Sequence, residues 1–86
     1  MNNNKLTVEI YGIKYPLRYA KDSDIPNIQK AANIVDEKMR KISQQNKYLP
    51  PDKLAVLTAL YLAEQLISLQ QDYDEFWDIL EENRSK

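Results

Sequence analysis

The stretch "PDKLAVLTALYLAEQLISLQQDYDEFWDILEE", residues 51–82, decides the fold of this chain. A proline and an acid at its start suit the first turn of a helix, and no Gly or Pro follows to end that helix. About 32 residues of helix are about 48 Å long at 1.5 Å per residue. A compact chain of this size has a radius of gyration of only ~12 Å. We therefore expect this helix to extend well beyond the body of its own molecule.

The apolar pattern changes along the predicted helix. Over residues 54–67 apolar side chains cover most of the circumference, which is typical of a helix buried on several sides. Farther along, the pattern narrows to a stripe with alternating steps of three and four, which is a heptad seam. The seam residues are Ala59, Leu62, Leu66, Leu69, Tyr73, Phe76 and Leu80. Because the head cannot reach the far part of this seam, we expect another copy of the chain, or a partner, to cover it.

The only Phe and the only Trp of the chain lie in its last part, in "LQQDYDEFWDIL", residues 69–80. Trp77 and Ile79 fall beside the seam, so the apolar stripe widens again at the far end. A two-stranded coiled coil leaves such residues half exposed, whereas a four-helix contact buries them. We therefore predict that Phe76 and Trp77 contribute to a contact between two dimers. The alternative is a break near residues 70–71 that folds the tail back as ordinary core.

Residues 6–19, "LTVEIYGIKYPLRY", predict a β-hairpin. Apolar and polar residues alternate on both sides of Gly12, the only glycine, which suits a turn that needs positive φ. Pro16 has no N–H to donate, so its backbone nitrogen is expected to face away from the partner strand. A hairpin alone is marginally stable in water, so helices must cover its apolar face.

A shorter helix is predicted over residues 24–43. Ser23 or Asp24 can cap its start, and Pro26 is tolerated in a first turn. Its apolar stripe again follows steps of three and four. The stripe consists of Ile25, Ile28, Ala32, Val35, Met39 and Ile42.

These elements make an α+β chain with a small head and a long C-terminal helix. The first half of that helix is expected to pack on the head and on a dimer partner, and the second half to form a coiled-coil stalk in a dimer or tetramer. The predicted segments are a flexible N-terminus 1–5, a head 6–50 with hairpin 6–19, helix 24–43 and loop 44–50, and the long helix 51–86.

Composition excludes several classes of function. The chain has no His and no Cys, so His-based acid–base catalysis, thiol nucleophiles, disulfides and Cys/His zinc sites are excluded. One glycine cannot build a phosphate-cradling loop, and adjacent carboxylates such as Asp36 and Glu37 do not face each other on a helix. We expect no enzyme activity, no cofactor and no small-molecule substrate. With no signal-peptide pattern and no membrane-spanning apolar run, a soluble cytoplasmic protein is expected.

The two parts of the chain carry opposite charge. Residues 1–50 contain nine Lys/Arg and five Asp/Glu, whereas residues 51–86 contain three and eight. A basic head could steer an acidic partner, although two solvated faces that differ by chance are the plain alternative. A nucleic-acid-binding dimer is a second possible class, but the chain is not basic overall and shows no nucleic-acid-binding motif. A coiled-coil adaptor for another partner is a third.

Four blocks of the sequence resemble the ZapA family of bacterial cell-division proteins. They are "VEIYGIKYPL" (8–17), "VDEKMRKI" (35–42), "NKYLP" (46–50) and "KLAVLTAL" (53–60). The resemblance covers residues 6 to about 69, in family order and spacing. It implies a non-enzymatic protein that binds the tubulin-like GTPase FtsZ, crosslinks its protofilaments, and promotes assembly of the Z-ring at mid-cell. It also implies homodimers that can pair into tetramers. Members of the family often have a polar or basic residue directly after the turn glycine; this position is Ile13 here, and Lys14 is the nearest substitute.

Two sets of candidate site residues follow. Exposed charges on the head are the candidate contacts to FtsZ: Lys14, Arg18, Arg40, Lys41, Asp52 and Lys53. The oligomer interface is expected to consist of the seam residues together with Trp77. No catalytic, cofactor or metal residues are assigned.

Overall fold

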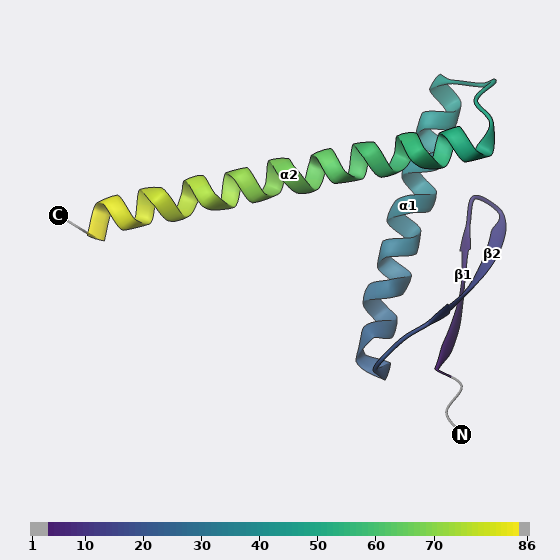
Figure 1. Cartoon of the computed structure of the whole chain (residues 1–86), viewed down its shortest axis with the longest axis horizontal. Helices are drawn as coiled ribbons and strands as arrows, with labels where there is room; N and C mark the ends of the chain where they lie inside the picture. The colour runs from purple at the N-terminus through teal and green to yellow at the C-terminus, as the bar shows by residue number, and fades with distance from the viewer. Residues whose placement is uncertain (1–3, 85–86) are drawn as a thin grey trace.

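The computed structural model describes residues 4–84 and contains a β-hairpin, two α-helices and one short 3₁₀ turn. Strands β1 (Lys5–Ile10) and β2 (Ile13–Arg18) pair antiparallel, and η1 (Asp22–Asp24) leads into α1 (Ile25–Gln45). After a short loop, α2 (Pro51–Arg84) runs unbroken to the end of the described chain. Figure 1 shows α2 crossing the C-terminal part of α1 and then leaving the head as a single projecting rod.

The molecule is elongated because α2 is longer than the head that it packs against. Its Cα radius of gyration is 17.9 Å, against ~12 Å for a compact chain of this length. The 34 residues of α2 give a helix about 51 Å long at 1.5 Å per residue. The continuous helix rules out the alternative of a break near residues 70–71, and the expected α+β architecture is confirmed.

A two-residue turn at Tyr11 and Gly12 closes the hairpin. Both residues have positive φ, 53° and 79° respectively, which is the geometry that matches the right-handed twist of two antiparallel strands. The structure has open space where a Cβ on Gly12 would lie. Gly12 is therefore required for its backbone conformation and not for close packing.

Only part of the hairpin's apolar face is covered by the chain itself. Val8 on β1 is 5% exposed, but Tyr15, its direct partner on β2, is 42% exposed. Ile13 and Leu17, on the same face of β2, are also exposed. Because α1 packs against β1, the apolar side of β2 is left without a covering helix.

The core of the head lies where α2 crosses α1. Met39 and Ile42 of α1 pack with Leu54 of α2, which is 1% exposed. Thr58, one turn after Leu54, is also buried, and its hydroxyl donates to the Leu54 carbonyl oxygen at 2.8 Å. That hydrogen bond satisfies the only buried polar side chain among the described residues.

The element boundaries differ slightly from those expected. Asn4 and Lys5 belong to the hairpin, since the Asn4 carbonyl accepts from the Tyr19 N–H at 3.0 Å, while residues 1–3 and 85–86 lie outside the described residues. Asp24 occupies the N-cap position of α1, but its carboxylate accepts from the Lys21 N–H at 3.1 Å and does not cap the helix. The helix ends at Gln45, two residues later than predicted.

Candidate functional site

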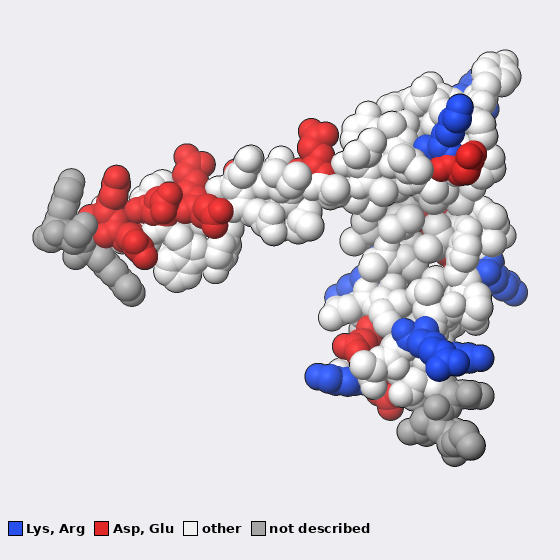
Figure 2. All heavy atoms as spheres, in the orientation of Figure 1, with Lys and Arg blue, Asp and Glu red and all other residues white. Residues whose placement is uncertain are grey.

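Basic side chains outnumber acidic ones on the head, and acidic side chains dominate the far end of the stalk. Figure 2 shows Lys and Arg side chains distributed over the head with some Asp and Glu among them, and a cluster of Asp and Glu side chains on the distal part of α2. Between residues 70 and 82 the sequence contains six acids and no base. A negatively charged partner is therefore attracted to the head and repelled by the far end of the stalk.

The six charged head residues proposed as contacts lie on three separate elements. Lys14 and Arg18 share one face of β2 with Pro16, because residues two apart in a strand point to the same side. Asp52 and Lys53 stand in the first turn of α2 and are exposed. No hydrogen bond or ion pair within residues 4–84 joins either pair to the other.

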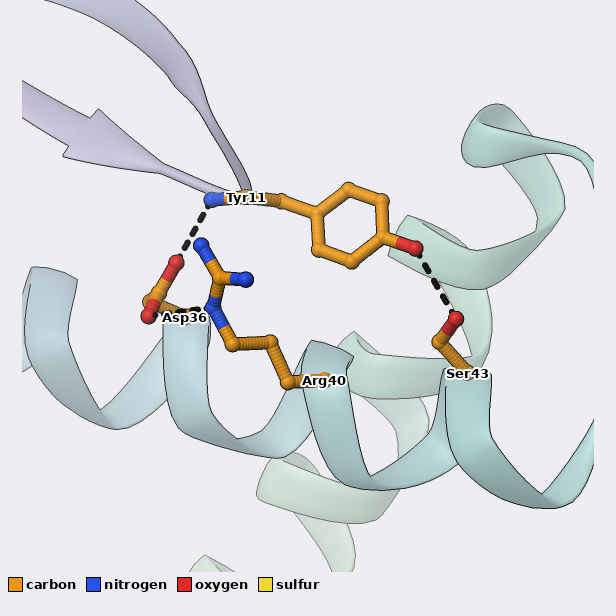
Figure 3. Close-up of polar contacts among 4 residues, drawn as sticks. All are labelled: Tyr11, Asp36, Arg40 and Ser43. Carbon is orange, nitrogen blue, oxygen red and sulfur yellow. Dashed lines mark hydrogen bonds and ion pairs between the residues drawn. The ribbon is translucent and has the colours of Figure 1, made fainter.

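Arg40 is the one member of this set that is held by its neighbours. Its Nε donates to Asp36 Oδ2 at 3.0 Å, and its guanidinium carbon lies 5.7 Å from the centre of the Tyr11 ring. The other Asp36 oxygen, Oδ1, accepts from the Tyr11 backbone N–H at 2.7 Å. Figure 3 shows Asp36 between the hairpin turn and Arg40, with the Tyr11 hydroxyl reaching Ser43 at 2.9 Å. One helix face thus fixes the hairpin turn at two points.

These contacts change the acidity of both ionised groups. The hydrogen bond from Arg40 and that from the Tyr11 N–H lower the pKa of Asp36 below its ordinary value, because both favour the charged carboxylate. The hydrogen bond to Asp36 raises the pKa of Arg40. The pair is ionised at neutral pH, so Arg40 presents a fixed positive charge beside the hairpin turn. Lys41, its neighbour, is exposed.

The loop between the two helices contains a candidate that the sequence interpretation missed. Tyr48 is 98% exposed, beside Lys47, in a loop that borders an open hollow of about 550 Å³. Tyrosine is enriched at protein interfaces, where it buries much area at low entropic cost. The sequence feature that could have indicated it is a large aromatic residue in a short loop, after a lysine and before the Leu-Pro-Pro segment that separates the two helices.

The seam residues of α2 form the second candidate surface. Leu66 is 55% exposed and Phe76 is 57% exposed, so the head covers neither. Trp77 packs edge-on against Tyr73, with ring centres 6.0 Å apart, and still remains 44% exposed. The remaining seam members are exposed too, except Leu62, which is half-buried. A row of large apolar side chains left in water along one helix marks a protein interaction surface.

Comparison with known proteins identifies the family. The model of the family described as "Cell division protein ZapA" matches residues 6–85. This chain belongs to the ZapA family. A "Cell division protein ZapA" of Geobacillus sp. (strain WCH70) is 38% identical over 82 residues, which are 95% of this chain and 92% of that protein. The ZapA of Bacillus subtilis (strain 168) is 39% identical over 67 residues, covering 78% and 76% of the two chains.

Two solved structures share the fold of this ZapA-family chain. One is described as "ZapA mutant dimer from Geobacillus stearothermophilus"; it has a TM-score of 0.70 and 31% identity, with 94% of this chain and 92% of that one covered. The other is described as "Unknown conserved bacterial protein from Pseudomonas aeruginosa PAO1", with a TM-score of 0.76, 30% identity, and 94% and 88% coverage. The family is one of cell-division proteins and not of enzymes. Within residues 4–84, neither helix has the length and apolar character needed to cross a bilayer.

Proposed function

We propose that this chain is a non-enzymatic cell-division protein that binds FtsZ, crosslinks its protofilaments and promotes assembly of the Z-ring at mid-cell. Membership of the ZapA family supports the division role. The single structural observation that carries the crosslinking role is the length of α2, which reaches far beyond the head and leaves its apolar seam exposed. Such a helix becomes stable in water when a second copy covers the seam.

Self-association supplies the geometry of a crosslinker. A dimer joined along the stalk carries two heads, and two dimers joined at the stalk ends carry head pairs at both ends of one rod. The structure described as a ZapA mutant dimer from G. stearothermophilus, which has the same fold, supports the first step. Weak sites repeated on one rigid frame gain affinity when both ends engage, provided that their spacing matches the target. Filaments, which repeat one binding surface, are targets of that kind.

The head surface is proposed as the side that meets FtsZ. The charged residues of β2, of the end of α1 and of the start of α2 would contact it, together with Tyr48. Its basic character, in contrast to the acidic stalk end, supports an acidic partner surface. No chemical step is required, because binding at two or more sites is sufficient to align filaments.

Sedimentation of FtsZ at two speeds tests this function. Fast centrifugation pellets all filaments, whereas slow centrifugation pellets bundles alone. With GTP present, we expect this chain to move FtsZ into the slow pellet and to co-sediment with it, while an unrelated protein of equal concentration leaves the slow pellet unchanged. The proposal fails if FtsZ stays out of the slow pellet although light scattering shows that this chain is oligomeric.

A further inference from the structure

Strand β1 has one edge that pairs with β2 and one edge that remains open. The Asn4 carbonyl accepts from the Tyr19 N–H, and the register then turns the main-chain groups of the even residues of β1 toward β2. The main-chain groups of Thr7 and Glu9 therefore point to the open side. No hydrogen bond within residues 4–84 reaches this side of Thr7 or Glu9. Two donors and two acceptors are left available there.

At one point on this open side, a side chain of α1 takes the place of a neighbouring strand. Tyr11 supplies the next outward-facing N–H in the row, and Asp36 Oδ1 accepts it at 2.7 Å. Among residues 4–84, this is the one hydrogen bond that joins an outward main-chain group of this row to α1. Farther from the turn, an open groove of about 480 Å³ is lined by Thr7, Val8 and Glu9 on one side and by α1 on the other. That volume lies within the ~300–1,000 Å³ typical of ligand sites.

The opposite wall of the groove is polar. Gln29, Asn33, Asp36 and Arg40 follow one another on α1 at spacings of four, three and four, so they share one face. Amide side chains can both donate to and accept from a peptide backbone. The groove therefore offers main-chain groups on one side and side-chain amides on the other, which is the environment that an extended polypeptide requires.

At the end of the groove next to the turn, the positive charge of Arg40 favours a ligand that carries a negative charge. Its Nε is used by Asp36, and its side chain is 56% exposed. Its two terminal amino groups make no hydrogen bond to any described residue. Figure 3 shows the guanidinium between Asp36 and the Tyr11 ring. A guanidinium held in this way is oriented in advance to bind a carboxylate.

The open edge of β2 differs in a way that favours β1 as the edge that binds. Pro16 lies opposite Thr7 and faces outward, so it removes a donor from that edge, and Lys14 and Arg18 flank it with charge. Proline and charged residues are the usual means by which proteins protect a strand edge from pairing. On β1, Lys5 and Glu9 likewise flank Thr7 with charge, but Thr7 keeps the outward N–H that Pro16 lacks, and this donor is the difference between the two edges.

We propose that the groove between β1 and α1 binds an extended segment of another protein, which adds as a strand to the open edge of β1 and places a carboxylate on Arg40. Recognition by strand addition takes its affinity from main-chain hydrogen bonds and its specificity from a few side-chain contacts. A second copy's apolar stalk does not match a groove walled by amides and ions. The inference goes beyond filament crosslinking and does not depend on it.

A synthetic peptide provides the probe. An acetylated and amidated peptide of sequence Thr-Val-Glu-Val-Thr-Val is titrated into the full chain while backbone amides are followed by NMR. We expect the amides of Thr7 and Glu9 to shift and to exchange with water more slowly. The same peptide N-methylated at alternate residues cannot form the row of hydrogen bonds, and we expect it not to bind. Replacing its Glu with Gln should weaken binding about tenfold, because Arg40 loses its charged partner.

Two pairs of protein variants localise the effect. Thr7→Pro removes the outward N–H without removing a bond of the hairpin, just as Pro16 does opposite, and should weaken binding about tenfold; Thr7→Val keeps the N–H and should bind within about twofold of the parent. Arg40→Gln should bind the Glu and Gln peptides equally. Glu9→Gln should bind the Glu peptide more tightly, since Glu9 is a negative charge close enough to act on Arg40.

Several outcomes would overturn the proposal. Equal binding of the peptide to Thr7→Pro and Thr7→Val would show that the edge is not used. Shifts confined to residues outside the groove would place the peptide elsewhere. A change in oligomeric mass caused by Thr7→Pro, with circular dichroism unchanged, would assign the edge to a second copy of the chain. None of these results bears on FtsZ bundling, which the sedimentation assay tests separately.

Discussion

The backbone N–H of Tyr11 donates to Asp36 Oδ1 at 2.7 Å, across a sequence separation of 25 residues. Tyr11 has a φ of 53°, a conformation that side-chain-bearing residues adopt only at some cost. A charged acceptor on α1 thus holds a strained turn in place, and the same carboxylate orients Arg40. Asp36 therefore couples the shape of the hairpin to the direction of a surface cation.

The first prediction concerns acid stability. The pKa of Asp36 is lowered in the folded chain from an ordinary value of 3.8, first by Arg40 and then by the Tyr11 N–H. A lowered folded pKa means that the contribution of Asp36 is fully present above the unfolded value and is lost as pH falls through the folded value. In the Asp36→Asn variant, we therefore expect the free energy of unfolding to fall less steeply as the pH is lowered through this range. Urea midpoints measured from neutral pH into acid check this, with Glu37→Gln, an exposed neighbour, as the control.

The second prediction concerns the core. Leu54→Ala should destabilise the chain by about 2–5 kcal/mol, since it leaves a cavity at the crossing of the two helices. Leu54 is 1% exposed, whereas Leu60 on the same helix is 62% exposed. Leu60→Ala is therefore the matched control, with an expected effect below about 1 kcal/mol in a monomer. Urea denaturation at several protein concentrations separates this core effect from changes in association, because a Leu60 effect that grows with concentration would reveal an intermolecular contact.

The third prediction concerns partner binding. Reversing the charge of Lys14 and Arg18 together should reduce co-sedimentation with FtsZ, because both project from one face of β2 on the basic head. The oligomer should stay intact, since neither residue lies on α2. Reversing Asp72 and Asp74 on the acidic stalk, a change of charge equal in size and opposite in sign, is the control for position. Unchanged co-sedimentation at physiological salt would exclude the hairpin as the contact surface.

The long helix could be predicted almost completely from the sequence, but the hydrogen bonds that join the hairpin turn to α1 could not. Helical periodicity and the absence of Gly and Pro are local properties, so α2 follows from residues 51–82 alone. The hairpin followed from alternation and one glycine. The contact between Tyr11 and Asp36 is set by how α1 docks on β1, and no local pattern encodes that docking. For the same reason Arg40 could be chosen as a surface charge, but not as an oriented one.

The sequence also could not predict which half of the hairpin's apolar face the chain itself covers. Alternation places Val8 and Tyr15 on one face, yet it cannot tell which strand a helix will cover. The exposure of Tyr48 also depends on the path of the loop between the helices. The charged contacts to FtsZ stay predictions for a further reason: a surface charge gains its role from a partner, and its own sequence neighbours do not reveal that partner.

The fourth prediction concerns the dimer. Leu66→Lys should raise the dissociation constant at least about tenfold, or about 1.4 kcal/mol, because a charge without a partner is placed in the seam. Leu66 is 55% exposed in the single chain, so the substitution should leave the fold of the head unchanged. Sedimentation velocity over a range of concentrations measures the shift. Gln65→Lys, one position away from the seam, should have little effect. A monomeric parent at tens of micromolar would contradict the whole scheme.

The fifth prediction concerns the end of the stalk. Tyr73 and Trp77 stack edge-on one turn apart, and Trp77 keeps 44% of its surface exposed, so the pair is ordered but not covered. A two-stranded coiled coil would leave Trp77 beside its seam, whereas a contact between two dimers would bury it. Trp77→Glu combined with Phe76→Ala should therefore leave a stable dimer, abolish the tetramer and weaken FtsZ bundling more than FtsZ binding.

Sedimentation equilibrium and the slow-pellet assay test the stalk end together. Asp78→Ala, a neighbouring change that keeps both aromatics, is the control, and it should preserve or strengthen the tetramer because it removes one charge from an acidic segment. An undiminished tetramer in the double variant would exclude the aromatic tail from the contact between dimers. A fall to monomer would show that Phe76 and Trp77 serve the primary dimer. Only loss of the tetramer with retention of the dimer matches a rod that carries a head pair at each end.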